Sequence, residues 1–286
     1  MLLFTFRLLS YLPLTVLQAM GRLVGRLVFA LPGQYRERLL ANVSQAGYTD
    51  RALAGRAAAQ AGAMIMELAR VWFRTPDSLA RVICEQEQEQ VLDEAINEGR
   101  GILFLTPHLG SFEMAARYTA QRKSLTVMFR PPRKAFLEPT MQAARNGSGV
   151  KTVPASQQGV RAFLRSLKSR QAVGMLPDQV PGEGDGAWAP FFGREAWTVT
   201  LPGKLAKSTD AIVIVAACER LPHGQGWRMH YVRAPEPLPA GAREQAMLFN
   251  HMMEQLIIRF PEQYLWGYNR YRRPSDVPPP PESAID

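Results

Sequence analysis

The chain has 286 residues, of which 47% are hydrophobic and 21% charged, so it can bury a real core and is not a disordered protein. Its 34 lysines and arginines exceed its 25 acidic residues, and the net charge of +9 suits an anionic partner: nucleic acid, an anionic lipid face or an acidic protein. The two cysteines, Cys84 and Cys218, are far apart and in no paired motif, which argues against a disulfide framework or a zinc ribbon. Cys218 ends an apolar run, and we expect it to be a core residue.

Residues 2–31 form the most apolar stretch and are expected to be helical. Arg22 and Arg26 lie one helical turn apart and share a face, while apolar side chains cover another face of the same helix. These apolar side chains are Leu23, Val24, Leu27 and Val28. The uninterrupted apolar span, residues 8–21, is shorter than the ~20 residues that a spanning helix needs. The pattern favours a helix at a membrane interface; a secretory signal and an ordinary core helix are the alternatives.

Residues 34–75 are also expected to be helical, because apolar side chains between Ala52 and Arg70 recur at helical spacing. A further helix is expected over Glu87–Asn97. The hydrophobic period then changes at Gly101, where a short apolar run is bounded by glycine and proline. This change marks the start of a region with strands.

From residue 101 onwards, strands alternate with helices. Strands are expected at Gly101–Thr106, Leu125–Phe129, Ala172–Leu176, Ile212–Cys218 and Arg228–Val232. Helices are expected at Phe112–Gln121, Phe136–Arg145, Gly159–Ser169 and Arg243–Phe260. The alternation indicates an α/β fold with a largely parallel central sheet flanked by helices. We expect a hydrophobic helix over 1–31, one layered domain over 32–276 and a proline-rich, disordered tail over 277–286.

His108 is the residue that we expect to be catalytic. It follows the strand at 101–106 and precedes a helix, and ligands bind at the carboxyl ends of strands in open α/β sheets. Glu113 lies on the first turn of that helix, and the intervening loop can fold its carboxylate back beside the imidazole. A carboxylate on one ring nitrogen fixes the tautomer and makes the other nitrogen a better base for an attacking alcohol. No covalent intermediate is required, and the chain has no G-x-S-x-G elbow; chance or core packing also produces this spacing.

Other polar residues follow the same logic. Asp178 comes directly after a buried-looking strand, so it is expected on the same rim as His108, with a loop-capping carboxylate as the alternative. If an alcohol attacks a carbonyl group, negative charge develops on the carbonyl oxygen, and Arg130 or Arg145 can stabilise it unless these are ordinary solvated arginines. The remaining histidines show no metal-ligand spacing, so we expect neither a metal nor a cofactor.

Four ordered blocks carry a resemblance to a known family. They are Pro107–Glu113, then Phe129–Pro131 with Arg145–Asn146, then Leu176–Gln179 with Phe191–Gly193, and finally Pro261–Trp266 closing on Arg273–Pro274. Over residues 101–274 the chain resembles the late acyltransferases of lipid A biosynthesis, the lauroyl/myristoyl transferase family of Gram-negative bacteria. That family belongs to the lysophospholipid acyltransferase-like superfamily.

The resemblance implies an acyltransferase that takes a fatty acyl chain from acyl carrier protein to a hydroxyl of an anionic glycolipid, a lipid A precursor. It implies His108 as the base and Glu113 as its partner. Arg145 would orient substrate or stabilise the oxyanion, and Asp178 and Gln179 would lie in the site wall. The substrate-binding residues are then Arg130, Arg145, Asp178, Gln179, Arg270, Arg272 and Arg273. The N-terminal helix would anchor the protein on the cytoplasmic face of the inner membrane.

One departure from the family concerns the acceptor. Where the family usually has Trp-x-His, this chain has Trp266-Gly267-Tyr268, and its following basic cluster is one residue shorter. An acceptor with fewer phosphates needs fewer cations, so a lysophospholipid or aminolipid acceptor, or acyl-CoA as donor, is an alternative. A non-catalytic lipid-binding protein is a second alternative, although binding alone needs neither His108 nor Glu113. A nucleic-acid binder is disfavoured because no RNP, zinc or helix-turn-helix pattern is present.

Overall fold

The computed structural model describes residues 2–129, 149–181 and 186–281. The helix expected at Phe136–Arg145 lies outside these described residues, and so do Arg130 and Arg145 themselves.

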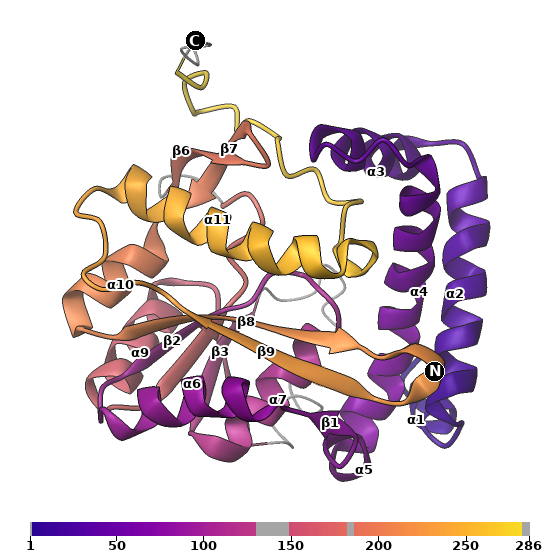
Figure 1. Ribbon diagram of the computed structural model, residues 1–286, viewed down its shortest axis with the longest axis horizontal. Coiled ribbons are helices and arrows are strands. Elements are labelled where there is room, and N and C mark those ends of the chain that lie inside the picture. Colours follow the sequence, from indigo (N-terminus) through magenta and orange to yellow (C-terminus); the bar gives the residue numbers. More distant parts are fainter. Residues whose placement is uncertain (1, 130–148, 182–185, 282–286) are drawn as a thin grey trace.

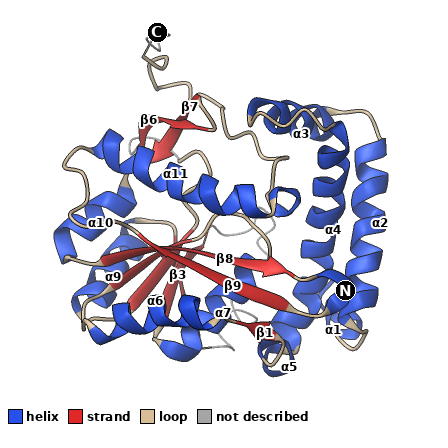
Figure 2. Cartoon of the chain, viewed as in Figure 1, coloured by secondary structure: helices blue, strands red, loops and turns tan. Residues whose placement is uncertain are grey.

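A seven-stranded sheet forms the centre of the molecule (Figures 1 and 2), in the strand order β1-β9-β8-β2-β5-β3-β4. The strands are β1 (Val82–Ile83), β2 (Ile102–Leu105), β3 (Leu125–Phe129), β4 (Val150–Pro154), β5 (Ala172–Met175), β8 (Ile212–Arg220) and β9 (Trp227–Arg233). All neighbouring pairs are parallel except β8 and β9. The expectation of an α/β fold with a largely parallel sheet is confirmed.

Helices cover both faces of this sheet, which is why its inner strands are continuous apolar runs. Along β2, Ile102 and Phe104 pack with one cluster of buried residues and Leu103 and Leu105 with the other. The first cluster includes residues of α6 (Gln86–Asn97) and α7 (Phe112–Arg122). The second includes residues of α9 (Gln157–Lys168), α10 (Leu201–Thr209) and α11 (Ala242–Arg259). The strand that precedes His108 is therefore buried at the middle of the fold.

Several elements escaped the sequence prediction. These include β1, β4, α10 and a hairpin of β6 (Gly186–Phe191) with β7 (Arg194–Val199). The hairpin turns at Phe192 and Gly193, both with positive φ, as a two-residue hairpin loop requires. Pro190 within β6 hides this strand in the sequence, because proline is disfavoured inside sheets. β1 has only two residues and β4 lies at the edge of the sheet, so neither shows a hydrophobic period.

The N-terminal apolar stretch forms two helices, not the single helix expected over 1–31. They are α1 (Leu2–Leu9) and α2 (Leu14–Ala30), and Pro13 directly precedes α2. Proline has no N–H to donate and disfavours a helical conformation of the residue before it, so it ends one helix and begins another. The remaining N-terminal helices are α3 (Gln34–Gln45), α4 (Arg51–Phe73) and α5 (Thr75–Leu79).

Helices α2 and α4 pack with their backbones in contact (Figure 1). A Cβ on Gly62 of α4 would lie 2.0 Å from the carbonyl oxygen of Gly21, and one on Gly25 would lie 2.1 Å from the carbonyl oxygen of Ala58. Only glycine permits such an approach. The opposite face of α2 is apolar and exposed, with Leu23 and Leu27 each 59% exposed.

Within the described chain, no single helix is both long and apolar enough to cross a membrane. By length and composition α2 and α3 together would be sufficient, but they meet at a bend of 97°.

A buried ion pair joins this helical region to the sheet. Arg220 at the end of β8 donates to both carboxylate oxygens of Glu67 on α4, at 2.7 and 2.8 Å, and neither side chain is more than 1% exposed. Gln18 of α2 donates to the same carboxylate at 3.1 Å. Arg220 also donates to the carbonyl of Gly110 at 3.3 Å, so the network extends from α2 to the loop after β2.

Candidate active site

The loop between β2 and α7, which carries His108, is fixed by backbone hydrogen bonds. The N–H of Gly110 donates to the carbonyl of Gln263 at 3.1 Å, and the N–H of Ser111 donates to the carbonyl of Cys218 at 2.7 Å. Gly110 has a φ of +61°, and a Cβ there would lie 2.1 Å from the Cys218 carbonyl oxygen, so the position requires glycine. The loop therefore holds His108 in one place at the carboxyl end of the central strand.

Asp178, which follows β5, binds His108 through both carboxylate oxygens. Oδ1 lies 2.7 Å from the imidazole Nδ1, and Oδ2 accepts the backbone N–H of His108 at 2.8 Å. Burial raises the pKa of Asp178, but its interactions with His108 and the nearby charge of Arg270 outweigh burial, so the pKa lies below its ordinary value. Asp178 is therefore an ionised, buried carboxylate at neutral pH.

This contact determines the state of the imidazole. An ionised carboxylate only accepts hydrogen bonds, so the proton of the neutral ring lies on Nδ1 and the lone pair on Nε2. The side-chain amide nitrogen of Gln179 lies 3.2 Å from Nε2 and donates to that lone pair. His108 is part-exposed, and its ring makes an edge contact with Phe112, with 5.1 Å between centroids. Nε2 is thus the atom that can take a proton.

The expectation that Glu113 holds the imidazole is corrected, because the carboxylate on Nδ1 belongs to Asp178. Glu113 accepts from Arg117 Nη1 at 3.1 Å and from Trp72 Nε1 at 3.4 Å. Arg117 is four residues further along α7, where helix geometry places it next to Glu113. A catalytic role for Glu113 stays a prediction.

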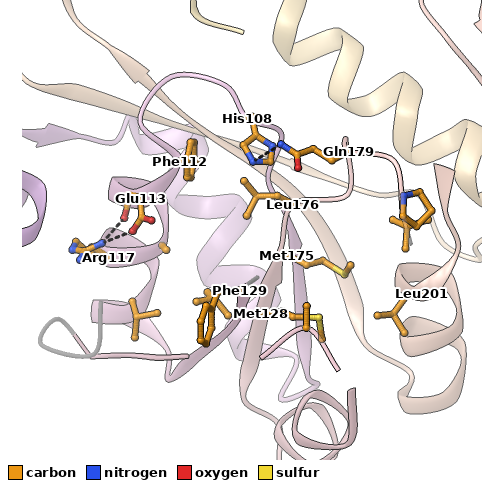
Figure 3. Close-up of a pocket in the computed structure, with 16 residues that line it drawn as sticks. His108, Phe112, Glu113, Arg117, Met128, Phe129, Met175, Leu176, Gln179 and Leu201 are labelled. Atoms are coloured by element: carbon orange, nitrogen blue, oxygen red, sulfur yellow. Dashed lines mark hydrogen bonds and ion pairs between the residues drawn. The ribbon is translucent and has the colours of Figure 1, made fainter. Parts of the chain in front are cut away.

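His108 and Glu113 both line one cavity of about 370 Å³. Most of its wall is apolar, from Phe112, Ala116, Val127, Met128, Phe129, Val150, Met175, Leu176, Val199 and Leu201. Figure 3 shows His108 with Gln179 on one side of this space, the Glu113–Arg117 pair on another, and Met128, Phe129 and Met175 further in. The cavity therefore combines a base, a buried ion pair and room for an apolar chain.

The arginines that were expected to bind substrate lie in different environments. Arg270 is buried, donates to the Trp197 carbonyl at 2.8 Å and to Thr198 Oγ1 at 2.7 Å, and lies over the ring of Phe191. Arg270 was expected among the substrate-binding residues, but its guanidinium is buried between the β6–β7 hairpin and Asn250 of α11.

The neighbouring cations are placed differently. Arg272 and Arg273 are exposed, and their contact with substrate stays a prediction. Arg130 and Arg145 lie outside the described residues, and their roles also stay predictions.

Residues that the sequence interpretation overlooked support the site. Arg117 is one of these residues. Its position four residues after Glu113 on a predicted helix could have indicated that the two side chains pair. Tyr268, the residue at the departure from the family motif, accepts the N–H of Val180 on its hydroxyl at 3.0 Å and so supports the loop that carries Asp178 and Gln179. Nothing in the sequence indicated this contact across 88 residues.

No group of three or more histidine, cysteine or acidic side chains in the described residues is arranged to hold a metal ion. Cys218 is buried, as expected, and burial raises the pKa of its thiol well above the ordinary value.

The fold and the site define a class of protein: an α/β enzyme whose histidine–carboxylate pair faces an apolar pocket. The family described as bacterial lipid A biosynthesis acyltransferase matches residues 1–273, and the chain belongs to this family. Membership confirms the resemblance found in the sequence blocks and identifies the activity as acyl transfer in lipid A biosynthesis.

Three similar proteins come from Escherichia coli strain K12. The lipid A biosynthesis palmitoleoyltransferase is 27% identical over 213 residues, covering 74% of this chain and 68% of that protein. The lauroyltransferase is 26% identical over 221 residues, covering 76% and 71%. The myristoyltransferase is 26% identical over 279 residues, covering 92% and 83%. The names of these three relatives specify different acyl chains.

Proposed function

We propose that this protein transfers a fatty acyl chain from acyl carrier protein to a hydroxyl of an anionic lipid A precursor, with His108 as the general base. One observation carries the proposal. Asp178 holds Nδ1 of His108 at 2.7 Å while the same residue lines a largely apolar cavity, so a base and a place for an acyl chain adjoin each other.

In the proposed reaction the acceptor hydroxyl displaces the Gln179 amide and donates its hydrogen bond to Nε2. Nε2 takes the proton as the hydroxyl oxygen attacks the thioester carbonyl, forming a C–O bond and an oxyanion. The oxyanion collapses, the C–S bond breaks, and the imidazolium returns its proton to the departing thiolate. The products are an ester and a free thiol. Asp178 stabilises the imidazolium, because it is an ionised carboxylate beside Nδ1.

The cations are proposed to contact the charged parts of the reaction. Arg145 is assigned to the oxyanion or to substrate orientation by the family resemblance, and Arg130, Arg272 and Arg273 to phosphate groups of the acceptor. Glu113 pairs with Arg117, and this pairing is proposed to keep the Glu113 carboxylate in a fixed position beside the pocket.

The exposed apolar face of α2 supports attachment to a membrane surface, which the family resemblance implies is the cytoplasmic face of the inner membrane. Leucine and valine side chains on that face suit the boundary between lipid head groups and acyl chains. A lipid acceptor could then reach the enzyme while its acyl chains stay in the bilayer.

The test is transfer of a labelled acyl chain from acyl carrier protein to a purified tetra-acylated lipid A precursor. We expect His108→Ala to lower the rate by about 10²-fold or more. His251→Ala is the control, because that histidine is exposed on α11. Transfer that survives in His108→Ala would show that the base is misassigned. No transfer by folded wild-type protein would contradict the proposed donor and acceptor.

A further inference from the structure

A second hollow adjoins the pocket of His108. It lies between α9 and α10 and has a volume of about 760 Å³. Its lining is shared with the first pocket at Met128, Ala155, Pro181, Val199 and Leu201, so the two hollows adjoin along a common wall. The groove, as we call the hollow between α9 and α10, therefore lies directly beside the pocket of His108.

Cations surround the outer end of this groove. Arg161 of α9 and Lys204 of α10 line it from opposite sides. Arg165 and Lys168 are exposed further along α9, and Lys207 is exposed one turn further along α10. Neither helix contains an aspartate or glutamate. The α9–α10 face, meaning these five residues and the groove between them, therefore has only cations among the charged side chains of its two helices. Asp210, which follows α10, is paired with Arg100.

The α9–α10 face lies at the end of the molecule opposite the N-terminal helices. Figure 1 shows α9 and α10 at the left and α1, α2 and α4 at the right of the long axis. The exposed apolar side chains of α2 are at the right-hand end. A surface bound through α2 would therefore leave the α9–α10 face directed towards solution.

We propose that the α9–α10 face is the docking surface for an acidic carrier protein, which places its acyl chain in the groove and delivers the thioester to His108. This inference rests on the proposed function and adds the place where the donor binds. An acidic protein complements two helices whose charged side chains are all cations, and a flexible arm with an acyl group suits a groove lined by Val160, Leu164 and Leu205.

An anionic membrane surface is the competing occupant of these cations. It accounts less well for the arrangement, because the exposed apolar side chains of α2, which would enter a bilayer, lie at the other end of the molecule. Cations around a groove that lies beside the pocket of the base are better matched to a donor that has to insert a chain.

The experiment compares two donors of the same acyl chain: acyl carrier protein and a small acyl-pantetheine thioester. The variant is Arg165→Glu with Lys207→Glu, one residue from each helix and neither in the groove lining. The control is Arg51→Glu with Arg259→Glu, which makes the same change in net charge at exposed positions elsewhere. A neutral variant, Arg165→Gln with Lys207→Gln, is measured beside them, and thermal denaturation verifies folding.

We expect the charge reversal to raise KM for acyl carrier protein about tenfold or more, to leave kcat within about twofold, and to leave both parameters for acyl-pantetheine unchanged. The neutral variant is expected to show a smaller rise, and the control none. Raising the salt concentration should raise the wild-type KM for the carrier and have less effect on the reversed variant.

Three results would overturn the docking proposal: an equal rise in KM for both donors, an unchanged KM for the carrier, or a loss of binding to anionic vesicles with unchanged use of the carrier. Binding of labelled acyl carrier protein, measured by fluorescence anisotropy without turnover, separates this proposal from the proposed function. Binding that is weakened by the reversal and not by the control supports the docking surface even where no acyl transfer is detected.

Discussion

At the scale of single residues, the site depends on a carboxylate that holds two groups of His108 at once. Asp178 accepts from the backbone N–H and from Nδ1 of the same residue, so it fixes the position of the loop as well as the tautomer of the ring. Arg270, buried behind it, contributes a positive charge that favours the ionised form. The dyad is therefore made by contacts between the ends of two adjacent strands, β2 and β5.

Asp178→Asn is expected to lower kcat by about 10²-fold or more. An asparagine oxygen can accept only one of the two hydrogen bonds. With the oxygen on the backbone N–H, its amide NH₂ donates to Nδ1, which moves the ring proton to Nε2 and removes the base. Steady-state transfer at saturating donor measures the change. Wild-type activity in this variant would show that Asp178 does not set the tautomer.

The same residue makes stability depend on pH. Because the pKa of Asp178 in the folded protein is below its unfolded value of about 4, its charge stabilises the fold above that pH. The contribution is lost as pH falls through the lower, folded pKa. We expect wild type to be more stable than Asp178→Asn at pH 7 and the difference to shrink below about pH 4. Thermal denaturation of both proteins from pH 7 to pH 3 measures this; a difference that grows on acidification would contradict it.

At the scale of elements, the close approach of α2 and α4 is the most sensitive feature. Gly62→Ala is expected to lower the free energy of unfolding by about 1–3 kcal/mol, because its Cβ would lie 2.0 Å from the backbone carbonyl oxygen of Gly21. Gly55→Ala on the same helix is the matched control: its Cβ would meet the Phe29 ring at 3.6 Å. We expect this control to be neutral or more stable by up to about 1 kcal/mol, as alanine favours helix. Equal effects in urea denaturation would show that the helices do not pack this closely.

The ion pair between Glu67 and Arg220 connects α4 to β8, and the two residues are 153 positions apart in the chain. Glu67→Gln is expected to cost about 3–5 kcal/mol of unfolding free energy, because Arg220 then stays buried without a carboxylate. The double variant Glu67→Leu with Arg220→Met should recover much of this loss. Arg56→Gln, in an exposed ion pair with Asp50, should change the melting temperature little. A double variant as unstable as Glu67→Gln would contradict this account.

The sequence predicted the elements that surround the site well and the contacts within it poorly. The strand before His108 and the helix after it follow from a change in hydrophobic period, which is local information. The partner of His108 lies 70 residues away, and its identity depends on β5 being the parallel neighbour of β2. Glu113 was the nearest carboxylate in sequence, but helix geometry pairs it with Arg117. Strand order is a property of tertiary structure, and no spacing in the chain reports it.

At the scale of the whole molecule, two surfaces of different character lie at opposite ends: exposed apolar side chains on α2 and cations on α9 and α10. Leu23→Asn with Leu27→Asn is expected to weaken partition onto lipid vesicles by more than about tenfold, since each leucine loses apolar area that would be buried in lipid. Met247→Asn with Ile258→Asn, at exposed positions on α11, is the control. Vesicle co-sedimentation measures the partition, and equal loss in both variants would contradict a role specific to α2.

The glycine contact between α2 and α4 also has a mechanical consequence. Backbones that touch with no side chain between them cannot slide past one another without a steric clash, and α4 is bonded through Glu67 to β8. Force applied to the apolar face of α2 would therefore reach the sheet directly. Held at a surface by that face, the protein would be anchored as one rigid body, with the mouth of its pocket at a constant height and angle.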